Sequence, residues 1–203
     1  MPAVTLKQQV QPIAKAAITV TFQGQSDNNR LATKFADKFS SGFANAIYSY
    51  VGMCIAPPTG GPTIAASTSK LKQDLIQTAK DAIIAMFQGE SDDNNIADRF
   101  SKPFGNFAMS MASYMPTCIV TPSAPPVIPL TPGNFIVCPP STVCVPSMYQ
   151  AAYQGMTDSF QGESDDMQLA NLFATQMQNI GNCIQPYVLT CAPLPGGGSL
   201  PVK

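Results

Sequence analysis

The sequence contains no histidine and no tryptophan among its 203 residues. Without histidine, the chain lacks the usual general base near neutral pH and the commonest metal ligand, which excludes Ser-His-Asp and Cys-His catalysis. It also lacks a glycine-rich phosphate loop after a strand and a nucleophile elbow. We therefore expect a protein that is not an enzyme and that uses no cofactor and no metal.

Charge is scarce as well, at 11% of residues compared with ~25% in an ordinary globular domain. The 11 basic residues are scattered and the net charge is -1, so we expect no binding to nucleic acid or to a membrane surface. No apolar run of about 18 residues is present to span a membrane, and the N-terminus does not read as a secretory signal. A surface with so few charges favours burial against other protein chains.

A short motif is present in three copies, which begin at Phe22, Phe87 and Phe160 and read FQGQSDN, FQGESDD and FQGESDD. Glycine favours the end of a helix, and serine or aspartate favours the cap of the next one. We interpret each copy as a turn between two helices. The candidate cap residues are Gly24, Ser26, Asp27, Gly89, Ser91, Asp92, Gly162, Ser164 and Asp165. The alternative, a Ca²⁺ site on the turn oxygens, lacks the EF-hand spacing.

Apolar residues recur at steps of three or four on both sides of each turn, which predicts amphipathic helices. The stripes after the turns end at Tyr50, Tyr114 and Tyr187. The turns and these tyrosines align the three copies along the chain. The second copy is one residue shorter than the first between its turn and its tyrosine. Residues that this alignment brings into register are called equivalent below. We expect Pro12 and Pro103 to kink or interrupt their helices.

These patterns predict an all-α protein of three αα-hairpin repeats, with about six main helices packed as a bundle or stacked in a row. A long Pro-rich extended arm separates repeats two and three. The predicted boundaries are residues 1–55 for repeat one, 56–68 for a Pro/Gly linker, 69–118 for repeat two, 119–146 for the arm, 147–191 for repeat three and 192–203 for a flexible tail.

The arm is rich in proline, yet it is too apolar for a solvated linker. We expect it to lie on a surface, of its own chain or of a neighbour, with a short strand at residues 135–138. Its candidate partner contacts are Val127, Ile128, Leu130, Phe135, Ile136 and Val137.

Six cysteines are present: Cys54, Cys118, Cys138, Cys144, Cys183 and Cys191. The first, second and last are equivalent, because each follows one of the three tyrosines at the same spacing. Cys138 and Cys144 are candidates for a small disulfide loop, while buried reduced thiols remain the alternative for all six. The carboxylates Asp37, Asp74, Asp81, Asp98 and Asp158 are expected on solvated helix faces.

The sequence favours a non-enzymatic structural subunit of a large assembly, namely a component of a phage or virus particle such as its capsid, neck, tail or baseplate. Made in the host cytoplasm and located in the virion, it would bind copies of itself and a second structural protein through apolar helix faces and the arm. The alternative is a secreted or periplasmic helical binding module that disulfides stabilise.

Overall fold

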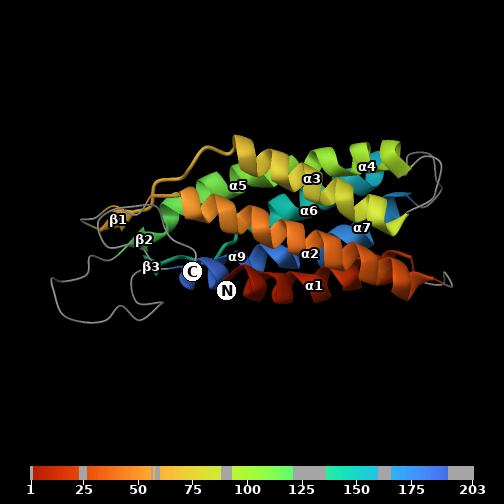
Figure 1. The fold of residues 1–203 in the computed structure, drawn as a ribbon, viewed down its shortest axis with the longest axis horizontal. Helices are drawn as coiled ribbons and strands as arrows, with labels where there is room; N and C mark the ends of the chain where they lie inside the picture. The colour runs from red at the N-terminus through yellow and green to blue at the C-terminus, as the bar shows by residue number, and fades with distance from the viewer. Residues whose placement is uncertain are drawn as a thin grey trace.

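Long helices that lie along one axis make up most of the molecule, and a small sheet lies at one end (Figure 1). The computed structural model describes residues 2–22, 27–55, 57, 60–87, 93–120, 136–159 and 166–191. Within these ranges the predicted all-α bundle is confirmed. No helix in the described ranges is both long enough and apolar enough to cross a membrane.

The helices follow the order in which the apolar stripes occur along the chain. They are α1 (Pro2–Thr21), α2 (Asn28–Met53), α3 (Ser69–Met86), α4 (Asp93–Ser101), α5 (Phe107–Tyr114), α6 (Cys144–Ser159), α7 (Asp166–Met177), α8 (Asn179–Asn182) and α9 (Ile184–Leu189). Two 3-10 turns, η1 (Lys102–Asn106) and η2 (Met115–Thr117), flank α5.

Prolines account for two helix interruptions but leave one helix continuous. Pro103 lies at the start of η1, directly after α4 ends at Ser101, so the predicted break is confirmed. Pro12 lies within α1, which continues through it as one helix. The stripe after the third turn predicts one helix, but the structure divides it into α7, α8 and α9. Pro186 in α9 has no N–H to donate toward residue 182, which explains the break at Cys183.

The helix α6 begins at Cys144, shortly before the predicted start of repeat three at Ser147. Pro146 therefore lies in its first turn, where the missing proline N–H leaves no hydrogen bond unmade. Cys144 is fully buried and is equivalent to Leu71, the first buried residue of α3. The cysteine thus belongs to the core face of a helix and not to the arm.

The helices close into a ring. Each packs against the next in chain order, from α1 and α2 through α3, the α4–α5 segment and α6 to α7, and α7 packs back against α1 (Figure 1). Of the two arrangements that the sequence allows, the bundle is therefore the observed one. The apolar stripes face inward and form one continuous core.

Phenylalanines fill the centre of the ring. The ring centroids of Phe35, Phe100 and Phe173 are 6.2, 5.9 and 5.8 Å apart in pairs, with edge-to-face geometry. These three residues are equivalent, since each lies at the same distance along the chain from its own turn. The next layer continues the pattern, with Phe39 and Phe104 at 5.6 Å.

A glycine allows a very close helix contact in the ring. Gly155 on α6 faces the last turns of α4, and a Cβ atom at Gly155 would lie 2.6 Å from the carbonyl oxygen of Phe100. Because that oxygen belongs to the backbone of α4, a side chain at residue 155 would force the two helices apart.

The sheet joins segments that the sequence places in the linker and at the two ends of the arm. Its strands β1 (Gly61–Pro62), β2 (Ile119–Val120) and β3 (Ile136–Val137) are antiparallel in the order β1-β2-β3. The expected strand near residues 135–138 is confirmed as β3. Ile55 and Ile64 form an additional antiparallel bridge beside the sheet.

Candidate functional site at the sheet end

The sheet presents an apolar outer face. Pro62, Ile119 and Val137 are aligned across the three strands, and all three are exposed. The bridged pair Ile55 and Ile64 is also exposed, by 44% and 55%. These five residues are called the outer sheet face below. An exposed group of aliphatic side chains is typical of a contact surface.

The inner face of the sheet packs against the bundle. Val120 and Ile136 are directly opposite each other across β2 and β3, and both are buried. Of the candidate arm contacts, Ile136 therefore belongs to the core and Val137 to the surface. Val127, Ile128, Leu130 and Phe135 lie outside the described residues.

A disulfide joins Cys118, directly before β2, to Cys138, directly after β3. The two Cα atoms are 4.2 Å apart and the cysteines are separated by 20 residues in sequence. The bond therefore closes the base of the segment between the two strands. This pairing corrects the candidate loop between Cys138 and Cys144, because Cys144 faces the core as part of α6.

The other four cysteines are free thiols. Cys54, Cys144 and Cys191 are buried, and Cys183 is half-buried. Burial raises the pKa of Cys144 and of Cys191 from 9.0 to about 12, and it raises the pKa of Cys54 and Cys183 as well. Because the reactive form of cysteine is the thiolate, these buried thiols are poor nucleophiles.

Polar side chains attach the segments around the sheet to the helices. The Thr63 hydroxyl donates to the Met115 carbonyl, and the Thr63 N–H donates to the Cys118 carbonyl at 2.9 Å. The Ser141 hydroxyl donates to the Gly181 carbonyl at 2.6 Å.

A second contact fixes the segment after β3 to α9. The Gln185 side-chain amide donates to the Cys138 carbonyl at 2.9 Å, and the Gln185 N–H donates to the Ser141 hydroxyl at 3.3 Å. Each connecting segment therefore bridges two neighbouring parts of the ring. Thr63, Ser141 and Gln185 were not predictable from the sequence, because isolated polar residues carry no periodic signal.

Three buried tyrosines lie below the sheet, at the equivalent ends of the three stripes. The Tyr50 hydroxyl donates to the Ala66 carbonyl at 3.4 Å, and the Tyr114 hydroxyl donates to the Pro139 carbonyl at 2.9 Å. The Tyr187 hydroxyl has no hydrogen-bond partner within the described ranges, although the residue is only 2% exposed. Burial raises the pKa of all three phenols.

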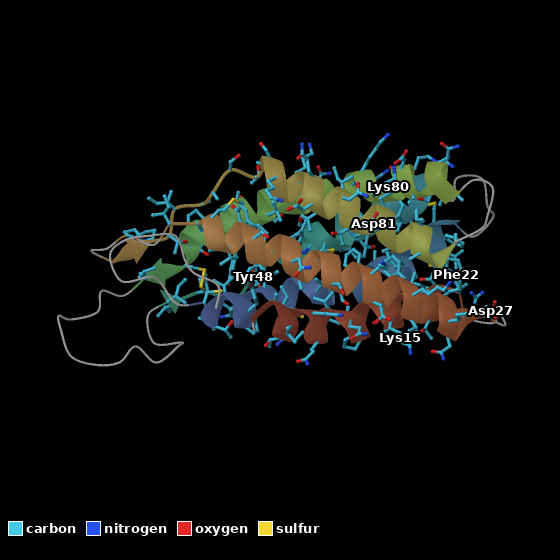
Figure 2. All side chains as sticks on the ribbon, viewed as in Figure 1. Lys15, Phe22, Asp27, Tyr48, Lys80 and Asp81 are labelled. Carbon is cyan, nitrogen blue, oxygen red and sulfur yellow. A yellow bond between two sulfur atoms is a disulfide. The ribbon has the colours of Figure 1, made fainter. Side chains whose placement is uncertain are left out.

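The candidate cap residues are almost all outside the described part of the chain. The exception, Asp27, lies at the N-cap position of α2, and its side chain makes no capping hydrogen bond to the described backbone. Its carboxylate instead pairs with Arg30 at 2.6 Å (Figure 2). Asp27 is thus the N-cap residue of α2 by position, without a side-chain cap to the described backbone, and the alternative cap Ser26 lies outside the described residues.

The candidate carboxylates lie on the outside of the bundle and are paired with neighbouring donors. Asp74 pairs with Lys70 at 2.7 Å, and Asp98 pairs with Lys80 at 2.6 Å. The hydrogen bond from Lys80 lowers the pKa of Asp98. Amide side chains one turn away contact Asp81 and Asp158. Asp37 is contacted from α1 by Gln11. In the part of the chain that the structure describes, no group of three or more acidic or cysteine side chains is placed to hold a metal.

A polar groove of about 440 Å³ lies between α2 and α3. Its walls include Lys38 and Lys70 as well as Asp74 and Asp81, so charges of both signs face it. A groove with balanced charge gives no preference for a ligand of one sign. The outer sheet face and the three buried tyrosines below it (Tyr50, Tyr114 and Tyr187) are therefore the stronger candidate site.

Comparisons with protein-family models, with curated proteins and with solved structures find no match. Function is therefore inferred from the geometry of this chain alone.

Proposed function

We propose that the chain is a non-enzymatic structural subunit of a large protein assembly, namely a component of a phage or virus particle such as its capsid, neck, tail or baseplate. It contacts copies of itself and a second structural protein. The observation that carries this proposal is the outer sheet face, where Ile64, Ile119 and Val137 are about half exposed. Burial of the exposed half of one such side chain stabilises a complex by about 1 kcal/mol.

The proposal includes three internal αα-hairpin repeats, with the arm between the second and the third. The meeting of Phe35, Phe100 and Phe173 at the centre supports these repeats, because the three residues are equivalent in sequence. The apolar helix faces are largely buried in the core, and the sheet end groups several exposed aliphatic side chains, so we infer that neighbouring subunits bind there. The scarcity of charge, at 11% of residues, is consistent with burial of part of that surface.

The test is the size of the protein in solution as its concentration increases, measured by sedimentation velocity. The wild-type chain is expected to self-associate. The double variant Ile119→Asp and Val137→Asp should remain monomeric, because it places two charges on the outer sheet face. Met109→Asp is the matched control, since Met109 is also exposed but lies on α5. A wild-type chain that stays monomeric at high concentration contradicts self-assembly.

The disulfide favours a second candidate function, a secreted or periplasmic binding module, because disulfides persist in oxidising compartments. Fractionation of the producing culture separates the two functions. A particle component sediments with particles, whereas a secreted module stays in the supernatant or the periplasm as a monomer with Cys118 and Cys138 oxidised. Intact mass with and without reductant reports the oxidation state.

A further inference from the structure

The groove between α2 and α3 is a surface feature separate from the sheet end, and it shares no residue with the outer sheet face. The two helices run antiparallel (Figure 1), and the groove follows α2 from Lys38 to Ser49 and α3 from Lys70 to Asp81. Such a length of helix rises by about 16 Å. The volume of about 440 Å³ is in the range of small-molecule sites, so the groove can take an elongated small ligand.

The groove is polar along its whole length. Among the described residues that line it, none is aliphatic or aromatic, and the two lysines and two aspartates cancel in formal charge. Interfaces between proteins bury apolar and aromatic side chains at their centre, and sites for phosphate or nucleic acid need an excess of cations. The groove has neither property. It suits a ligand that is polar and uncharged.

Thr78 is a buried polar residue in the lining of this groove, only 7% exposed. Several threonines in the helices of this protein donate to the carbonyl four positions earlier, as Thr21, Thr33 and Thr157 do at 2.7, 2.8 and 3.0 Å. Thr78 makes neither this bond nor another side-chain hydrogen bond among the described residues. Because a buried hydroxyl without a partner is costly, its presence requires an explanation.

The Thr78 hydroxyl lies against α2 and not against its own helix. A Cβ atom at Gly42 would be 2.5 Å from the Thr78 Oγ1 atom. Since Gly42 and Thr78 both line the groove, the hydroxyl lies at its floor. Close helix packing explains the glycine but not the hydroxyl, because valine at residue 78 would fill the same space without an unpaired polar group.

Two more uncharged side chains of the groove have free hydrogen-bonding groups. Asn45 and Ser49 lie one turn apart on α2, and neither forms a side-chain hydrogen bond within the described ranges. Three of the four charged residues are already engaged: Lys70 pairs with Asp74 at 2.7 Å, and Asp81 accepts from a neighbouring amide at 2.7 Å. The free uncharged groups are thus one carboxamide and two hydroxyls, which both donate and accept hydrogen bonds.

We propose that the groove between α2 and α3 binds a short, linear, uncharged oligosaccharide, with Thr78, Asn45 and Ser49 as its hydrogen-bonding residues. Sugar hydroxyls also donate and accept, so they match these three groups, and a chain of sugar units follows the length of the groove. The sugar supplies the partner that the Thr78 hydroxyl lacks. The inference goes beyond the proposed function and does not rest on it.

The test is a titration of the whole isotope-labelled protein with maltotriose, cellotriose and triacetylchitotriose, followed by two-dimensional NMR. Saturable shifts of amides in residues 38–49 and 70–81 are expected for at least one sugar. A Thr78→Val variant should raise the Kd of that sugar roughly 2- to 10-fold, because one hydrogen bond is lost. Thr157→Val is the matched control and should bind as the wild type does, since the hydroxyl that it removes is bonded within α6.

A surface variant keeps the test independent of packing around Thr78. Asn45→Ala changes an exposed residue and should also weaken binding, whereas Gln73→Ala changes an exposed residue of α3 outside the groove and should not. Shifts centred elsewhere, or equal affinity of wild-type and Thr78→Val protein, would overturn the proposal. So would an absence of saturable shifts with all three sugars. Tighter binding of the acidic trigalacturonate, or of the uncharged peptide acetyl-triglycine amide, would assign the groove to another ligand class and overturn it as well.

The double variant Ile119→Asp and Val137→Asp separates this inference from the proposed function. It should lose self-association and keep sugar binding, because both substitutions lie on the outer sheet face. If it loses sugar binding, the sugar binds at the sheet end and the assignment to the groove is overturned. A wild-type chain that self-associates without binding any sugar refutes the groove only, and one that binds sugar but stays monomeric contradicts self-assembly only.

Discussion

Tyr114 and Tyr187 are a natural pair for measuring one hydrogen bond, because they occupy equivalent buried positions and only Tyr114 has a partner among the described residues. Replacing Tyr114 by Phe should destabilise the protein by about 0.5–1.5 kcal/mol, since the Pro139 carbonyl loses its donor. Replacing Tyr187 by Phe should leave stability unchanged or slightly raised, since its buried hydroxyl has no acceptor among the described residues. Urea unfolding of both variants measures the difference. A larger loss for Tyr187→Phe than for Tyr114→Phe would show that the Tyr187 hydroxyl is paired within the chain.

The buried thiols predict a loss of stability at alkaline pH. Cys144 and Cys191 have pKa values raised by burial from 9.0 to about 12, so the native state keeps their protons where the unfolded state loses them. Their contribution to stability is therefore complete below pH 9.0 and is lost as the pH rises toward about 12. The free energy of unfolding, measured from about pH 7 to 11 under conditions that keep the disulfide intact, is expected to fall above about pH 9.

A cysteine variant provides the control for this pH dependence. Cys144→Ala should be less stable at neutral pH, because it leaves a small cavity. It should also show a shallower fall above about pH 9, because one titrating group is gone. An unfolding free energy that stays constant through this range would show that the thiols ionise equally well in the folded protein.

At the scale of the helices, Gly155 controls how closely α6 approaches α4. Gly155→Ala should destabilise the protein by about 1–3 kcal/mol, because its Cβ atom would lie 2.6 Å from the Phe100 carbonyl oxygen. Gln150→Ala is a suitable control on the same helix, since Gln150 is exposed. Thermal unfolding followed by circular dichroism compares the two. If alanine at residue 155 stabilises the protein through its better helix propensity, the contact is looser than the structure indicates.

The helices were largely predictable from the sequence because their apolar faces have a period. Phe35, Phe100 and Phe173 come from three separate stripes, and all three are buried. The break at Pro103 was predictable from its missing N–H. The start of α6 was misplaced because Pro146 suggested a non-helical segment, although the equivalence of Cys144 to Leu71 contained the correct signal.

The strands and their pairing were less predictable. A strand as short as Gly61–Pro62 or Ile119–Val120 cannot show the alternation of a sheet. Its partner is set by how the helices pack and not by its neighbours in sequence. The same reason explains why the disulfide partner of Cys138 is Cys118, since only the sheet brings the two together. The hydrogen bonds of the site depend likewise on contacts distant in sequence.

At the scale of the whole molecule, the disulfide is the covalent link between the two sides of the sheet. Its reduction should lower the free energy of unfolding by about 3 kcal/mol, because the cysteines are separated by 20 residues and the loop they close restricts the unfolded chain. Urea unfolding with and without reductant measures this loss. The double variant Cys118→Ala and Cys138→Ala should show a similar loss and no further response to reductant.

The closed ring also determines how the molecule responds to tension. The start of α1 and the end of α9 lie at the same end of the bundle, where the two helices are in contact (Figure 1). Five of the six neighbouring pairs around the ring are consecutive in the chain, and the sixth is the non-covalent contact of α1 with α7–α9. A force that separates the start of α1 from the end of α9 therefore acts on that contact from its edge. Its side chains then separate one turn after another, as in unzipping, and not all at once as in shear.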